Sequence, residues 1–185
     1  MLFLPFQLGP TLLRNRMVMA PMTRNRADAN HVPTPIMVEY YRQRASMGLI
    51  ITEGVAPAPN GAGYARIPGM YTAEQAAAWR LITDAVHARE GRIFMQMMHT
   101  GRASHVSNLP AGAAVVGPTA TPMPGEIWTD TAGMLPPSTP SALTDAQIQD
   151  TVGEFVYSAT LAIEAGFDGV ELHGANGYLL EQFLN

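Results

Sequence analysis

Residues 93–98 read Ile-Phe-Met-Gln-Met-Met, a short run that is almost uniformly apolar. Strands of this composition are typical of a parallel sheet that is covered on both faces. Three further runs of the same character lie along the chain, at 17–20, 49–52 and 169–173. We therefore predict four strands of one parallel sheet.

Helical patterns separate these runs. Thr34 supplies a cap residue and Pro35 a proline at the first helical position, ahead of a helix predicted over 36–45. Two longer helices begin at Thr72 and Thr144, each followed three residues later by Gln, which is the spacing of a capping box. Strands that alternate with helices predict an α/β fold with right-handed crossovers.

The segment 103–143 interrupts this alternation, because it is rich in Pro, Gly, Ser and Thr. A loop of this length inside an α/β unit is often functional, as a lid or rim, although a solvated insertion has the same composition. We expect a long rim loop here, with a short hairpin around 114–119. Because the sequence contains no internal repeat and no linker, we predict that residues 1–185 belong to a single domain.

Composition excludes several classes of chemistry. The 185 residues are 47% hydrophobic and 14% charged, which suits one folded core. The chain has no Cys, so disulfides, thiolate nucleophiles and Cys-based metal sites are excluded, and its eleven basic residues are all Arg, which excludes Schiff-base lysines. A net charge of −4 without basic runs argues against nucleic acid, and short apolar runs argue against a membrane partner, so we expect a cytoplasmic protein.

Gln96 is the polar residue of the central run. Ligands of α/β proteins gather at the carboxyl ends of parallel strands, where its side chain would lie. A buried amide needs both a donor and an acceptor as partners. Two interpretations remain open: Gln96 bonds to neighbouring backbone, or it pairs with the imide edge of a ligand such as the pyrimidine edge of a flavin.

His173, Asn176 and Tyr178 follow the fourth run at spacing i, i+3 and i+5. If this loop begins as a helical turn, the first two side chains can donate to one carbonyl or nitro oxygen, as in an oxyanion site. Tyr178 would then offer a phenolic proton nearby. The alternative is structural, with a capping Asn, a hydrogen-bonded His and a Tyr on the rim.

Two carboxylates and three histidines are candidates for structural roles or for metal ligation. Glu53 and Glu171 lie on predicted strands and are expected to be structural partners of Arg side chains or backbone donors. The spacing of His99 and His105 matches no compact zinc pattern, and with His173 they form only a weak candidate for metal ligation. We therefore expect no metal.

Six motifs, in order and at matching spacing, resemble the N-terminal half of the old yellow enzyme family of FMN-dependent ene-reductases (NADH:flavin oxidoreductases). The motifs are NRMVMAPMTR at 15–24, YYRQRA at 40–45, ITEG at 51–54, GY with PGMYTAEQ at 63–64 and 68–75, QMMHTGR at 96–102, and FDGVELHGANGYLLEQFLN at 167–185. Each alone is weak, and together they are specific.

This resemblance implies a fold and a cofactor. The fold is a (β/α)8 TIM barrel, of which residues 1–185 would cover roughly the first half, about four strands. FMN would lie across the carboxyl ends of the strands, with the Thr23 hydroxyl near the flavin O4 and Gln96 on the pyrimidine edge. The implied cofactor-binding residues are Ala20, Pro21, Met22, Thr23, Gly54, Gln96 and His173.

The resemblance also implies a reaction, the ping-pong reduction of activated alkenes with NADPH or NADH. His173 and Asn176 would hold the oxygen of an α,β-unsaturated carbonyl or nitro compound, and Tyr178 would protonate the α-carbon. Tyr64 and Met98 would line the substrate pocket, where several relatives carry Trp in place of Met98. The competing hypotheses are a non-catalytic half-barrel and, less favoured, a metal-dependent hydrolase.

The family continues through roughly as much sequence again, including the loops that hold the FMN phosphate and a flavin-contacting Arg. Four strands of a barrel would leave two unpaired edges and apolar surface that favour association. We therefore expect a complementary C-terminal half, as a second chain or a separate segment, or self-association of this half as a homo-oligomer.

Overall fold

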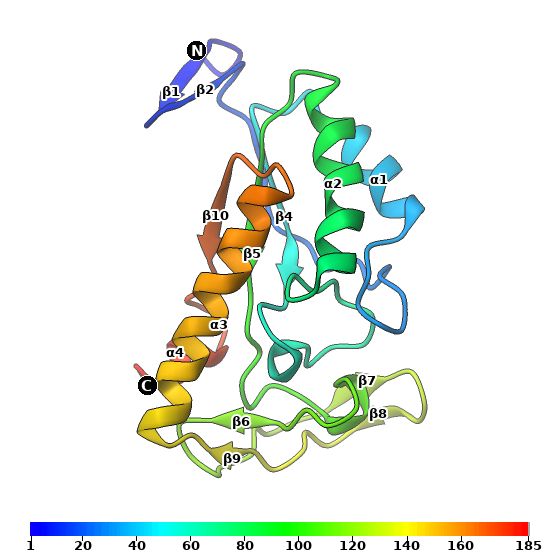
Figure 1. The fold of residues 1–185 in the computed structure, drawn as a ribbon, viewed down its shortest axis with the longest axis vertical. Helices are drawn as coiled ribbons and strands as arrows, with labels where there is room; N and C mark the ends of the chain where they lie inside the picture. Colours follow the sequence, from blue (N-terminus) through cyan, green and yellow to red (C-terminus); the bar gives the residue numbers. More distant parts are fainter. Residues whose placement is uncertain (185) are drawn as a thin grey trace.

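A four-stranded parallel sheet forms the centre of the computed structural model, which describes residues 1–184 (Figure 1). Its strands stand in the order β10-β5-β4-β3, and each neighbouring pair is parallel. They are β3 (Val18–Met19), β4 (Leu49–Val55), β5 (Ile93–Met97) and β10 (Gly169–Leu172). Each lies on one of the four predicted runs, so the predicted sheet is confirmed. β4 extends three residues beyond the predicted 49–52, and β3 keeps only two residues of its run.

Three helices connect the strands, namely α1 (Pro35–Arg42), α2 (Ala73–His87) and α3 (Asp145–Glu164), and a short helix α4 (Leu179–Gln182) follows β10. Both predicted capping boxes are present, at Thr72 and at Thr144. Thr34 is the N-cap of α1, but its hydroxyl donates to the Arg26 carbonyl instead of capping the helix. α1 ends at Arg42, three residues before the predicted 45.

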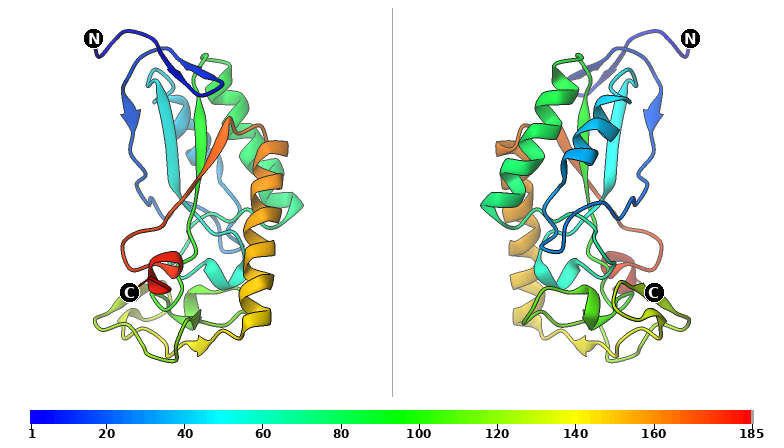
Figure 2. Two further views of the ribbon diagram at one scale, coloured as in Figure 1. Left: turned by 90° about the vertical axis from the view of Figure 1, so that its left-hand side faces the viewer. Right: turned by 90° about the vertical axis from the view of Figure 1, so that its right-hand side faces the viewer.

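The core lies between the helices and one face of the sheet, as the two side views show (Figure 2). Trp79, Ile82 and Val86 of α2 are fully buried there, against the odd-numbered side chains of β5. The Trp79 indole also donates to the Gly69 carbonyl at 3.0 Å, so its one polar atom is satisfied. The even-numbered residues of β5 therefore point to the opposite face, which carries the candidate site.

The two ends of the sheet carry different additions (Figure 1). At the amino end lies an antiparallel hairpin of β1 (Phe6–Leu8) and β2 (Thr11–Leu13). At the carboxyl end the segment 103–143 contains two small sheets and a 3-10 turn, η2 (Val106–Asn108). A second 3-10 turn, η1 (Pro59–Gly61), follows β4.

The prediction of a hairpin around 114–119 is wrong. β6 (Val116–Gly117) pairs in parallel with β9 (Ser141–Ala142), so its partner lies 25 residues away in sequence. The hairpin of this segment is instead formed by β7 (Ile127–Thr129) and β8 (Gly133–Leu135). Its turn uses Gly133 at φ +71°, and the Thr129 hydroxyl holds the turn by accepting from the Ala132 N–H.

None of the helices within residues 1–184 is long and apolar enough to span a lipid bilayer.

Candidate active site

The candidate site lies at the carboxyl ends of the parallel strands, where the segments 20–23, 54, 96–98 and 173–178 come together. All of them directly follow or end a strand of the central sheet. Parallel strands end at the same edge, so residues as far apart in sequence as 20 and 178 lie at one end of the molecule. The parallel sheet therefore places these four segments at one end of the molecule.

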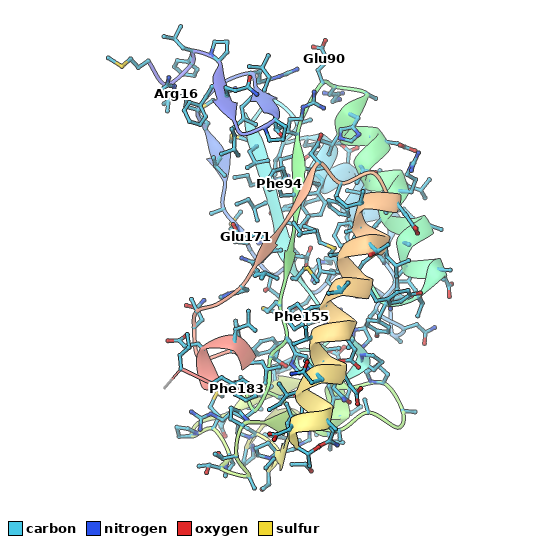
Figure 3. The ribbon with its side chains drawn as sticks, turned by 60° about the vertical axis from the view of Figure 1, so that its left-hand side comes forward. Arg16, Glu90, Phe94, Phe155, Glu171 and Phe183 are labelled. Carbon is cyan, nitrogen blue, oxygen red and sulfur yellow. The ribbon has the colours of Figure 1, made fainter. Side chains whose placement is uncertain are left out.

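Gln96 and Glu171 form a hydrogen-bonded pair on the face turned away from the helices. The two residues are opposite each other in the β5–β10 ladder, and the Gln96 Nε2 donates to the Glu171 Oε1 at 2.7 Å (Figure 3 labels Glu171). A carboxylate only accepts, so this contact fixes the amide nitrogen toward Glu171 and turns the amide oxygen away. Gln96 thus presents an acceptor to a ligand N–H.

This pair corrects the expectation for Glu171, whose structural partner is a side-chain amide instead of an Arg or a backbone donor. For Gln96, the partner of the side chain is a carboxylate and not the neighbouring backbone, which was one of the two open interpretations. The Thr52 hydroxyl completes the arrangement, because it accepts from the Gln96 backbone N–H at 3.0 Å. No local pattern indicates this pair, because its members lie 75 residues apart in sequence.

Glu53 is structural, as expected. It is 1% exposed, and its two carboxyl oxygens accept from the Tyr41 hydroxyl and the Arg24 backbone N–H, each at 3.1 Å. Burial raises the pKa of Glu53, while these two donors oppose the increase. The carboxyl group therefore joins β4 to α1 and to the segment after β3.

His173 and Asn176 converge, although the loop between them is not a helical turn. The His173 Nδ1 accepts from the Ala175 N–H at 3.3 Å, which in a neutral ring places the proton on Nε2. The Asn176 Nδ2, also a donor, lies 3.4 Å from that Nε2. Two donors at this distance do not bond each other, but both can donate to one oxygen atom.

Tyr178 stands next to this donor pair. Its ring packs edge-on against the His173 ring, with centroids 4.9 Å apart, and its hydroxyl donates to the Tyr64 hydroxyl at 3.3 Å. Burial and the contact with Tyr178 raise the pKa of Tyr64, so Tyr64 stays protonated at neutral pH. The structure thus brings the predicted pocket residue Tyr64 to the predicted proton donor.

Gln182 holds the 173–178 loop in place and was not identified from the sequence. Its Nε2 donates to the Gly177 carbonyl at 2.6 Å and to the Thr100 carbonyl at 3.0 Å, and its Oε1 accepts from the Arg102 N–H at 3.1 Å. The side chain is 7% exposed, so all these bonds are shielded from water. Its position four residues after Tyr178, on the same helical face, is the only sequence signal for it.

Met98 and Gly54 are in direct contact at the base of the site. A Cβ atom on Gly54 would lie 2.5 Å from the Met98 Sδ, so the absence of a side chain lets Met98 lie against β4. Met98 is 2% exposed and belongs to a buried apolar cluster against which Tyr64 and Tyr178 pack. A Met side chain has several accessible rotamers and can adjust its position.

The residues at this end fit a flavin. Met22 and Thr23 are exposed, and their backbone N–H groups make no hydrogen bond within residues 1–184. Free donors beside the fixed acceptor of Gln96 match a planar heterocycle that carries carbonyl oxygens and an imide N–H. Ala20 and Pro21 directly follow β3, and Gly54 lies on the neighbouring strand β4, so these uncharged residues form a wall next to the donors.

The histidines considered for metal ligation do not converge. The His99 Nδ1 accepts from the Gly101 N–H, and the His105 Nδ1 accepts from the Ser107 N–H. Each ring therefore stabilises the backbone turn that follows it. Within residues 1–184 no group of three His, Asp or Glu side chains is placed to hold a metal ion. This geometry gives the hydrolase hypothesis no support.

The comparison with known families matches residues 1–185 to the NADH:flavin oxidoreductase / NADH oxidase family. The chain belongs to this family. An old yellow enzyme homologue from Zymomonas mobilis superimposes with a TM-score of 0.95 at 42% identity, covering 100% of this chain and 51% of that one. The resemblance to old yellow enzymes and the barrel class are therefore confirmed, and FMN is the cofactor of the family.

Two curated relatives are similarly close. A probable flavin mononucleotide-dependent alkene reductase of Leishmania infantum is 44% identical over 97% of this chain and 50% of its own length. A probable inactive reductase, easA, of Epichloe festucae var. lolii is 45% identical over 99% of this chain and 47% of its own length. The chain thus spans about half the length of these relatives. Because one of them is named inactive, side chains and not overall similarity must decide the activity.

His99 provides a pH test of this region. Its ring is 2% exposed, its Nε2 has no partner within residues 1–184, and burial lowers its pKa from 6.5 to about 4. Between these two values the unfolded chain binds a proton that the folded chain does not, so the free energy of unfolding falls as the pH decreases. The loss is complete below pH 4 and amounts to about 3 kcal/mol.

Denaturant unfolding of the parent and of His99→Asn at several pH values between 7.5 and 4.5 measures this effect. We expect a clearly smaller loss of stability on acidification in His99→Asn, because Asn keeps an acceptor near Gly101 but does not titrate. His105→Asn, on the rim segment, is the matched control. Parallel pH dependences in the parent and His99→Asn would contradict the assignment.

Proposed function

We propose that this chain supplies the flavin-facing and substrate-activating half of an ene-reductase, which reduces the C=C bond of α,β-unsaturated carbonyl or nitro compounds with NADPH or NADH in a ping-pong cycle. One observation carries the proposal: the His173 Nε2 and the Asn176 Nδ2 lie 3.4 Å apart and can donate to one oxygen, with Tyr178 beside them. Family membership supports it.

The cofactor would be held by the wall described above. We propose that Ala20, Pro21, Met22 and Thr23 offer backbone groups and one hydroxyl, that Gly54 and Gln96 border the ring, and that His173 closes one side. FMN, reduced by NADPH or NADH, supplies the hydride that adds to the β-carbon of the alkene. Glu171 keeps the Gln96 amide in the orientation that accepts from an imide N–H.

The remaining chemistry belongs to the side chains of this chain. His173 and Asn176 polarise the alkene by donating to its carbonyl or nitro oxygen, which stabilises the charge that develops there. Tyr178 gives its phenolic proton to the α-carbon and regains one from solvent. Tyr64 accepts from the Tyr178 hydroxyl in the resting site and so keeps that hydroxyl in place, while Met98 forms a wall of the pocket.

We further propose that a complementary C-terminal half completes the barrel. An apolar groove of about 410 Å³ opens between α3 and β10, the edge strand of the sheet. Val156 and Leu172, which line it, are 63% and 59% exposed. A further strand and helix of the barrel would cover this surface, and the matched relatives contain about twice as much sequence.

The absorption spectrum of the purified protein from 300 to 600 nm, together with the intact mass of every polypeptide present, tests the whole proposal. We expect a flavin band near 450 nm that NADPH or NADH bleaches, in a sample that contains the complementary half. A colourless, monomeric 185-residue chain that takes up no FMN would refute the catalytic role and favour the non-catalytic half-barrel.

Removal of either oxygen-binding donor should weaken ligand binding. In the FMN-loaded protein, His173→Ala and Asn176→Ala should each raise the dissociation constant of a phenol or an enone by about 5- to 150-fold, the equivalent of about 1 to 3 kcal/mol for a lost donor. Titration followed by the flavin absorbance measures this, with His105→Ala as the control. Unchanged constants in both variants would remove the pair from the site.

Replacement of Tyr178 should separate the two half-reactions. In stopped-flow experiments Tyr178→Phe should slow alkene reduction by about 100-fold or more, the usual contribution of a general acid, while flavin reduction by the nicotinamide is unchanged. Tyr64→Phe should slow the same half-reaction less, because it removes only the partner of the Tyr178 hydroxyl. Equal losses in both half-reactions would argue against a proton donor at this position.

A further inference from the structure

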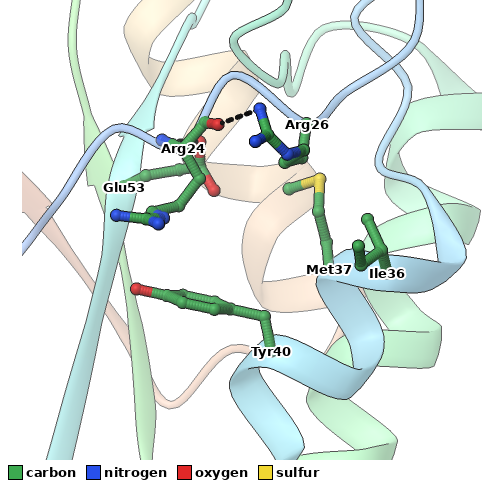
Figure 4. Close-up of a pocket in the computed structure, with 6 residues that line it drawn as sticks. All are labelled: Arg24, Arg26, Ile36, Met37, Tyr40 and Glu53. Atoms are coloured by element: carbon green, nitrogen blue, oxygen red, sulfur yellow. Dashed lines mark hydrogen bonds between the residues drawn. The ribbon is translucent and has the colours of Figure 1, made fainter.

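A pocket that contains two arginines lies outside the candidate active site, between α1 and the segment that follows β3 (Figure 4). Its volume is about 140 Å³, close to the size of a cavity that holds one benzene ring. Ile36, Met37 and the Tyr40 ring form its apolar walls, and Arg24 and Arg26 form its polar side. The pocket thus combines a ring-sized apolar space with two guanidinium groups.

Positive charge gathers around Tyr40, on arginine side chains that form no ion pair in the described part of the chain. The guanidinium carbons of Arg24 and Arg44 lie 5.4 and 3.9 Å from the centre of its ring. Arg26 donates to the carbonyls of Arg24 and Asn25, and Arg44 to the carbonyl of Tyr40. Within residues 1–184, no carboxylate forms an ion pair with Arg24, Arg26 or Arg44, although five other arginines of the chain do form such pairs.

Glu53, on the floor of the pocket, attracts Arg24 and Arg26 electrostatically but forms no ion pair with either of them. Both of its carboxyl oxygens already accept hydrogen bonds, from Tyr41 and from the Arg24 backbone, and the side chain is buried. The guanidinium groups of the pocket therefore have N–H donors that can reach a further acceptor. A guanidinium group binds a carboxylate through two parallel hydrogen bonds, which makes a carboxylate the matching ligand.

We propose that this pocket binds a small organic carboxylate, with the carboxylate group on Arg24 and Arg26 and a ring or short aliphatic group against Tyr40, Ile36 and Met37. The pocket is distinct from the alkene-binding side of the molecule, since none of its residues belongs to the 173–178 loop or to β5. Its volume matches an anion with one ring. The site does not depend on catalysis by the strand-end residues.

Isothermal titration calorimetry of the purified FMN-loaded protein with benzoate tests the site, and benzamide is the neutral analogue of matched shape. We expect saturable binding of one benzoate that Arg24→Gln weakens at least ten-fold, with much weaker binding of benzamide. The substitution keeps the Arg24 backbone N–H that bonds Glu53, so the fold is preserved. Arg24→Lys, which keeps the charge but not the two-pronged donor, should fall between the parent and Arg24→Gln.

Two controls locate the ligand. Arg89→Gln removes one positive charge at the amino end of the sheet and should leave binding unchanged. The double variant His173→Ala, Asn176→Ala should also bind benzoate normally, which separates this pocket from the candidate active site. Benzoate binding that is lost in the double variant but kept in Arg24→Gln, or the absence of saturable binding in the parent, would overturn the proposal.

Discussion

The parallel pairing of β4, β5 and β10 is the constraint on which the site depends. Because these strands run in the same direction, their carboxyl ends meet at one edge, and the register places Glu171 beside Gln96. The Thr52 hydroxyl bonds the Gln96 backbone N–H across the irregular part of the β4–β5 ladder. A slip of one residue would turn Gln96 toward the helices and replace the polar contact by an apolar side chain.

The second requirement is the loop 173–178, which begins at a backbone bond from the His173 N–H to the Met97 carbonyl of β5, at 3.0 Å. Residues 173–178 leave the sheet, and Asn176 and Gly177 both adopt positive φ, at +60° and +72°. Gln182 satisfies this loop and the segment after β5 with one buried amide, and the Leu179 N–H donates to the His99 carbonyl at 2.9 Å. Loss of such an amide would leave several buried backbone groups without partners, each at a cost of about 1 to 3 kcal/mol. The His173 and Asn176 donors are therefore oriented by α4.

Local sequence was sufficient where local physics decides the structure. Apolar runs located the four strands, and the Thr-x-x-Gln spacing located the starts of α2 and α3, because a capping box is closed within four residues. The same reasoning failed for the β6–β9 pair and for the partner of Gln96, since both join segments that are distant in sequence. The convergence of His173 and Asn176 was predicted by their spacing, but on the assumption of a helical turn that the structure does not contain.

The open edge of the sheet and the donor pair are physically connected. The apolar groove beside β10 is lined by Leu180 of α4 as well as by Val152 and Val156 of α3. A segment that covers this groove would bury its exposed apolar surface, with a gain in free energy of about 25 cal/mol per Å². The same segment would pack against α4, the helix that contains Gln182. A segment that completes the barrel would therefore stabilise α4, and through Gln182 the 173–178 loop. Completion of the barrel and orientation of the oxygen-binding donors are therefore coupled. A half-barrel whose groove is exposed would hold these donors less rigidly than the completed barrel.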